Sequence, residues 1–174
     1  MYRITISENG VGKPELYSSD VSLNARTYIT KNNSLCYFKD VSNDIGDLFI
    51  GNKNIDYDVY IYKVTYNART DQLLYLSDCS LTTFFSSDAY YGTLKIYAEE
   101  ESQRIADDVF NYSPMADGSI LYIYDYSASS QTGELRSYNK SETEKIADDV
   151  QYIIQIVDYR TMMDIYVHGE YTAL

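Results

Sequence analysis

The chain has 174 residues, with 26 Asp or Glu against 14 Lys or Arg, and its formal net charge is −12. This charge argues against direct nucleic-acid binding, because phosphate backbones require clustered basic side chains. One histidine, two cysteines without CxxC spacing and no glycine-rich phosphate loop leave little for metal, thiol or phosphate chemistry.

Strand signals begin at the first residues. Residues 2–7 alternate apolar and polar side chains, which predicts a strand. From Val41 to Phe49, apolar residues recur at spacings of three and four, which predicts a helix over 41–50 that stops at Gly51. Residues 57–66 carry apolar or aromatic groups on both faces and predict a central, covered strand.

The second half also reads mainly as strands, with one duplicated cassette. Ile-Ala-Asp-Asp-Val occurs twice with similar flanks, in segments 101–109 and 142–150, which lie 41 residues apart. Ser141 and Glu144 form a capping box, so the second copy is expected to begin a short helix. The cassettes are either a true repeat or a chance similarity. Further strands are predicted over 72–77, 93–97, 119–126, 150–157 and 163–168.

These patterns together predict an α+β fold. We expect a single domain over residues 1–174, built on a twisted, mostly antiparallel sheet with a few short helices. The first residues lack the basic start and apolar stretch of a signal peptide, and no run is long enough to span a membrane. A cytoplasmic location is therefore expected.

Tyrosine is the most over-represented residue type, at 21 positions, against 5 Phe and no Trp. Surface tyrosines give a large contact area at low entropic cost and are enriched at interfaces. The alternative is that Tyr122 and Tyr124 are core residues. The candidate partner-binding residues combine rings with carboxylates: Tyr57 and Asp58; Phe85, Asp88, Tyr90 and Tyr91; and Tyr124, Asp125 and Tyr126.

An acidic, aromatic surface without catalytic cassettes favours a protein-binding module over an enzyme. Carboxylates can replace phosphates in a basic groove and tyrosines can replace stacked bases. The concrete hypothesis is a nucleic-acid mimic: a phage or mobile-element inhibitor that occupies the nucleic-acid site of a host defence enzyme. It requires a basic protein partner and no cofactor, metal or membrane. A third possibility is that the acidity serves solubility alone.

The order of several segments resembles the ADP-ribosyltransferase-like fold. Tyr2-Arg3 lies in the first strand, the segment 38–42 precedes the expected helix, and Gln151 lies on a late strand. The resemblance implies NAD as cofactor, bound by an enzyme or by a protein that retains only the fold. It assigns cofactor binding to Arg3, Tyr37 and Phe38, and catalysis to Arg3, Ser42 and Gln151.

Overall fold

The fold is all-β in every part that the structure describes. The computed structural model describes the backbone of residues 2–3, 6–7, 10–11, 15–16, 19–22, 24–84 and 87–153, and the side chains of 19–22, 24–81 and 90–153. These residues form strands and turns without a helix, so the predicted α+β fold is wrong. Consequently none of them forms a helix that could cross a membrane.

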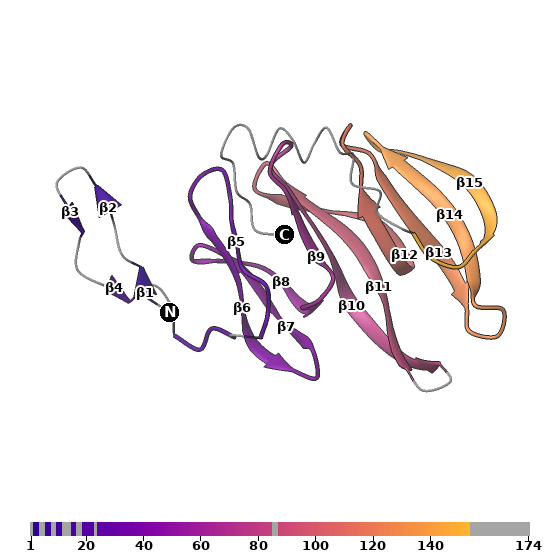
Figure 1. Ribbon diagram of the computed structural model, residues 1–174, viewed down its shortest axis with the longest axis horizontal. Coiled ribbons are helices and arrows are strands. Elements are labelled where there is room, and N and C mark those ends of the chain that lie inside the picture. Colours follow the sequence, from indigo (N-terminus) through magenta and orange to yellow (C-terminus); the bar gives the residue numbers. More distant parts are fainter. Residues whose placement is uncertain are drawn as a thin grey trace.

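Two antiparallel meanders make up most of the described chain (Figure 1), and in each one every strand pairs with its neighbour in sequence. The four-stranded sheet contains β5 (Tyr28–Ile29), β6 (Leu35–Ser42), β7 (Ile45–Ile50) and β8 (Lys53–Tyr60). The seven-stranded sheet contains β9 (Val64–Asn67), β10 (Gln72–Phe84), β11 (Ser87–Ala98), β12 (Glu101–Pro114), β13 (Ile120–Ser127), β14 (Thr132–Asn139) and β15 (Glu142–Val150). Two short ladders precede them: β1 (Tyr2–Arg3) with β4 (Glu15–Leu16), and β2 (Ile6–Ser7) with β3 (Gly10–Val11).

One three-stranded pattern occurs three times along the chain. We call β6–β8 the first unit, β10–β12 the second and β13–β15 the third. In each unit a glycine of the second strand pairs with a valine of the third, and a two-residue turn joins these strands. The hairpin formed by the second and third strands is shorter in the first unit than in the other two. The equivalent pairs are Gly46 with Val59, Gly92 with Val109, and Gly133 with Val150.

Each unit bends at two Asp residues whose φ lies in the left-handed region. Asp tolerates this conformation better than most residues, and it occurs where a strand bulges. Register shifts fall at the first-strand positions. Some of the acidic residues of the chain therefore have a backbone role, because they form the bends of the strands. The first-strand residues are Asp40, Asp78 and Asp125, with φ of 51°, 52° and 50°; the third-strand residues are Asp58, Asp108 and Asp149, with φ of 52°, 50° and 57°.

The duplicated cassettes form equivalent strands rather than helices. They lie on β12 and β15, where Leu94 pairs with Ala106 just as Leu135 pairs with Ala147. Ser141 lies in the turn before β15, so the predicted capping box caps no helix. The similarity of the cassettes is a true structural repeat, because they have the same pairing register.

The helix predicted over 41–50 is also wrong. These residues form the end of β6, a turn at Asn43-Asp44 and β7. The spacing of three and four arose because two strand alternations are separated by this turn, whose residues have φ of 49° and 62°. The predicted strand 57–66 is interrupted between β8 and β9, whereas 72–77, 93–97 and 119–126 lie almost wholly in β10, β11 and β13. Residues 151–153 are not in a strand, and 154–157 and 163–168 lie outside the described residues.

Adjacent units bury each other's apolar faces in two core clusters. Leu73 and Tyr75 of the second unit complete the first cluster, and Ile120 and Tyr122 complete the second from equivalent positions. Each unit therefore depends on the next for burial, as expected of a repeat architecture. The first cluster also contains Cys36, Phe38, Leu48 and Val59, and the second contains Leu74, Leu76, Leu94 and Val109.

Candidate functional site

An open cleft with four carboxylates lies beside the first unit. It has a volume of about 430 Å³ and opens between the β6–β7 hairpin, β8 and the bulge of β10. Three of the carboxylates come from bend residues of the repeat with left-handed φ, namely Asp40, Asp58 and Asp78. The cleft is lined by Asp40, Ser42, Asn43, Ile45, Gly46, Asp47, Asp58, Asp78 and Cys79.

Asp47 contributes the fourth carboxylate. At the equivalent position, the third unit has an acid that is paired with cations, and the second unit has no acid. Its equivalent in the third unit is Glu134, whose carboxylate lies 2.9 Å from Arg136 and 3.5 Å from Lys145. The first unit has Phe49 and Asn54 at the positions of these two cations. The second unit has Thr93 in place of the acid. The excess of negative charge is therefore specific to the first unit and is not required by the repeat.

The carboxylates of the cleft repel one another. Burial and the nearby charges of Asp40 and Asp58 raise the pKa of Asp47, whereas hydrogen bonding to Arg136 lowers the pKa of Glu134. Within the described part of the chain, no Lys or Arg forms an ion pair with Asp40, Asp47 or Asp58. The cleft thus carries charge that a positively charged group would stabilise.

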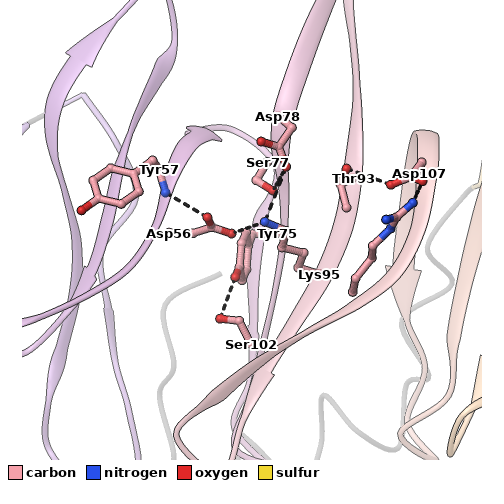
Figure 2. Close-up of polar contacts among 10 residues, drawn as sticks. Asp56, Tyr57, Tyr75, Ser77, Asp78, Thr93, Lys95, Ser102 and Asp107 are labelled. Carbon is pink, nitrogen blue, oxygen red and sulfur yellow. Dashed lines mark hydrogen bonds and ion pairs between the residues drawn. The ribbon is translucent and has the colours of Figure 1, made fainter.

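Lysine 95 links the two units beside this cleft (Figure 2). Its Nζ lies 2.7 Å from the Asp56 carboxylate and 3.5 Å from that of Asp78, so it offsets only part of the charge of Asp78. Tyr75 donates a hydrogen bond of 2.9 Å to Ser102 in the same region. The ion pair of Lys95 with Asp56 connects β11 of the second unit to β8 of the first. The contacts of Lys95 with Asp78 and of Tyr75 with Ser102 lie within the second unit.

Two tyrosine rings, Tyr60 and Tyr90, adjoin the acidic cleft, and Tyr62 packs against Tyr60. Tyr60 stacks on Tyr90 with ring centroids 4.1 Å apart, and Tyr62 meets Tyr60 edge-on at 5.7 Å. Tyr90 donates a hydrogen bond of 3.1 Å to the carbonyl of Asn43, a residue that lines the cleft. Burial, followed by the charge of Asp44, raises the pKa of Tyr60. The Tyr62 side chain is 51% exposed, so part of this ring cluster is accessible.

The sulfur of Cys79 offers no nucleophile to this cleft. Burial raises the pKa of its thiol to about 12, and the charges of Asp78 and Asp58 act in the same direction. The thiolate is the reactive form, so the thiol remains inert near neutral pH. No group of three His, Cys, Asp or Glu side chains among the described residues is arranged to hold a metal ion.

The structure divides the predicted partner-binding residues between several places. Tyr90 adjoins the cleft and Asp58 lines it, whereas Tyr57, although 62% exposed, is not among the cleft residues. Tyr91 and Tyr126 lie 6.4 Å apart and both contact Phe110. Because Tyr90 and Tyr91 are successive residues of a strand, their rings point to opposite faces.

The remaining predicted residues are less closely grouped. Tyr124 is half-buried beneath the Arg136 guanidinium, 4.3 Å from the ring centroid, and Asp125 is an exposed bend residue. Tyr122 is fully buried, as the core alternative expected. Asp88 is described only as a backbone position of β11, and Phe85 lies outside the described residues. The partner-binding role of the whole set remains a prediction.

The sequence analysis did not single out the cleft carboxylates Asp40, Asp47 and Asp78. It also did not single out Tyr60 and Tyr62 as binding residues. One usable signal was present. The segment Ile55-Asp56-Tyr57-Asp58-Val59 is a third, degenerate copy of the Ile-Ala-Asp-Asp-Val cassette. Aligning it would have identified a first unit and placed one of its two bends, at Asp58.

The residues of the NAD-binding alternative do not converge in the described part of the chain. Tyr37 and Phe38 are 1% and 0% exposed and belong to the core, where the Tyr37 hydroxyl donates to the carbonyl of Gly51 at 2.9 Å. Ser42 is exposed at the end of β6 in the first unit, whereas Gln151 is exposed just after β15. The backbone of Arg3 lies in β1, and its side chain is outside the described set. The helix expected after Ser42 is replaced by β7.

Comparison with known proteins gives no relative from which a function could be transferred: no protein-family model, curated protein or solved structure matches the chain.

Proposed function

We propose that this chain is a protein-binding module that receives basic side chains of a partner in the acidic cleft of its first unit. The observation that carries the proposal is the uncompensated charge of Asp47 beside Asp40 and Asp58. Aromatic rings next to carboxylates suit Lys and above all Arg, whose planar guanidinium both stacks and forms paired hydrogen bonds. Tyr60 and Tyr90 lie beside the cleft, and the exposed Tyr62 extends their ring cluster.

The biological form of the proposal is an inhibitor acting in the cytoplasm. Encoded by a phage or another mobile element, it would occupy the basic nucleic-acid site of a host defence enzyme. The carboxylates of the cleft would replace phosphates, and the tyrosines beside it would replace bases. The net charge of −12 supports this form, because it speeds encounter with a basic surface and disfavours acidic partners.

The test uses a labelled arginine-rich octapeptide and fluorescence anisotropy with the full chain. Charge-driven binding should weaken by about tenfold or more between 50 and 500 mM salt, because the Debye length shortens below the spacing of the charges. The double variant Asp40→Asn, Asp58→Asn should also bind weakly. Asparagine suits these positions because it removes the charge and tolerates the left-handed backbone.

The repeat supplies a matched control for this variant. Asp125 and Asp108 are the equivalents of Asp40 and Asp58 in other units, have the same backbone conformation and do not line the cleft. The variant Asp125→Asn, Asp108→Asn changes the net charge equally and should bind like the parent chain. Equal weakening in both double variants would show that only the net charge acts, and the proposal would be rejected.

The inhibitor form has its own test. An enzyme captured from host lysate by the parent chain but not by the cleft variant should lose its bound nucleic acid when the chain is added. If the enzyme keeps its nucleic acid at saturating chain, the inhibitor form is wrong while the binding module stands.

A further inference from the structure

We propose a second contact site for the same kind of partner: the outer edge of β15 pairs with an extended segment in which Lys or Arg alternates with apolar residues. This inference rests on the proposed function, since both require a basic protein. It adds a distinct surface, located on the third unit. Pairing of this kind extends a sheet by one strand and draws affinity from main-chain hydrogen bonds.

The first observation is the position of β15 at the edge of the seven-stranded sheet. Among the described residues it pairs only with β14. The equivalent strands of the other units are covered, because β12 pairs with both β11 and β13, and β8 lies against β10 of the next unit. An edge strand presents a row of unpaired N–H and C=O groups, which is a template for another strand.

The second observation is an apolar side chain that its equivalents bury. Ile146 of β15 is 52% exposed. Ile55 and Ile105 hold the same position in the first and second units, where both are half-buried and pack against the core clusters. Tyr152, just after the strand, is 60% exposed. The third unit therefore retains apolar surface that the adjoining unit covers elsewhere. Ile146 is two positions from Glu144, so the aliphatic part of a Lys side chain of an added strand can cover it.

The third observation is the charge of the strand. Its nine residues include four acids, Glu142, Glu144, Asp148 and Asp149, and the single base Lys145. Lys145 is already engaged within its own sheet, 2.6 Å from Asp148 and 3.5 Å from Glu134. Opposite charges on facing strands stabilise a pair, so the segment that fits this edge is basic.

The same charges argue against a second copy of the chain as the occupant. Antiparallel pairing of β15 with itself about Ile146 would place Glu144 opposite Asp148. Like charges directly opposite each other destabilise a strand pair. A basic partner avoids this repulsion and covers the same apolar side chain.

The experiment titrates the full chain with an acetylated and amidated (Lys-Val)4 peptide. Binding is followed by anisotropy, and protection of individual amides by hydrogen exchange. The expected result is binding together with increased protection of β15 amides. A Glu-Val peptide should not bind, and a Lys-Val peptide with prolines at alternate positions should bind at least tenfold more weakly, because proline lacks the amide that a strand donates.

Two charge variants locate the contact. Glu144→Gln introduces the residue that β12 has at the equivalent position, Gln103, and is combined with Glu142→Gln. This variant should weaken binding by about tenfold, since each exposed ion pair contributes about threefold. The control, Glu99→Gln with Glu101→Gln, alters the corresponding turn region of the second unit and should leave the affinity unchanged.

Each contrary outcome identifies a different error. If Asp40→Asn with Asp58→Asn abolishes binding and the β15 variant does not weaken it, the peptide occupies the cleft; the proposed function stands and this inference fails. Equal binding of the proline peptide also overturns it, because strand pairing is then not involved. The informative amides are those of β15 that point away from β14. If these outward amides are fully protected in the free monomer, or only in a concentration-dependent dimer, the edge belongs to the chain itself or to a second copy. If the arginine-rich octapeptide binds the cleft but the Lys-Val peptide does not bind, this inference alone fails. If neither peptide binds, both proposals fail.

Discussion

Replacement of Gly92 by alanine should destabilise the fold by about 1–2 kcal/mol, although alanine usually stabilises a strand relative to glycine. A Cβ at this position would lie 2.6 Å from the carbonyl oxygen of Ser77 and 2.7 Å from the sulfur of Cys79. Overpacking of this kind costs about 1–3 kcal/mol. The smaller conformational freedom of unfolded alanine returns about 0.4–1 kcal/mol.

The contact with the Ser77 carbonyl oxygen recurs in another unit of the repeat. Gly133 has the same relation to the carbonyl of Tyr124, at 2.7 Å, and Ser77 and Tyr124 each precede a left-handed Asp. Gly133→Ala should therefore cost a similar amount. In a Cys79→Ala background the Gly92→Ala penalty should persist in large part, since removing the sulfur leaves the Ser77 oxygen in place.

Urea unfolding followed by circular dichroism measures these differences in the free energy of unfolding. The reasoning requires both glycine variants to unfold at lower urea with unchanged slope. It is refuted if Gly92→Ala lies within 0.5 kcal/mol of the parent chain. It is also refuted if Cys79→Ala abolishes the penalty, because a side-chain contact alone would then explain it.

Four other perturbations test separate parts of the structure. The raised pKa of Asp47 means that its ionisation opposes folding. This contribution is absent below the ordinary pKa of 3.8, grows between that value and the folded-state pKa, and is fully present above the folded-state pKa. Asp47→Asn should therefore stabilise the chain at pH 7 more than at pH 3, and equal urea midpoint shifts at both pH values would contradict this. Asp108→Ala should lower the free energy of unfolding by about 1 kcal/mol, whereas Asp108→Gly should lower it little, because the Cβ of alanine disfavours a φ of 50° and glycine has no Cβ. Thermal unfolding measures both, and equal losses would contradict the backbone role. Tyr75→Phe removes a hydrogen bond to Ser102 and should lower the free energy of unfolding by about 0.5–1.5 kcal/mol, as measured by urea unfolding. An unchanged free energy would indicate that the Tyr75 hydroxyl bonds to water instead. Cys79 should react with a thiol reagent at pH 8 far more slowly than free cysteine, since its pKa is about 12; rapid labelling in the native state would contradict its burial.

Local patterning predicted the central strands well and the helices badly. The apolar runs over 72–77 and 119–126 identified β10 and β13, because a strand buried between units is apolar on both faces. Over 41–50 the periodicity rule failed, because the Asn43-Asp44 turn joins two alternations into an apparent helical spacing. Turns with two left-handed residues usually contain a glycine that marks them in the sequence. This turn is Asn-Asp, so neither glycine nor proline marks it.

The acidic and aromatic residues had a second role that composition could not reveal. Asp residues such as Asp108 and Asp149 bend the strands, and rings such as Tyr75 and Tyr122 fill the contacts between units. Both roles belong to the repeat. The cassettes of the sequence indicate the repeat only in part, and the pairing registers define its three units. Asp47 departs from this pattern, and nothing in the local sequence marks it, because its importance comes from the cations that the first unit lacks.

The most direct test of the proposed cleft is the pKa of Asp47, followed by carboxyl NMR with and without the arginine-rich octapeptide. A cation seated among Asp40, Asp47 and Asp58 relieves their mutual repulsion. Binding should therefore shift the pKa of Asp47 downward and release protons near the midpoint of its titration. If the peptide binds while the pKa of Asp47 stays where it is in the free chain, the basic group lies elsewhere and the account of the cleft is wrong.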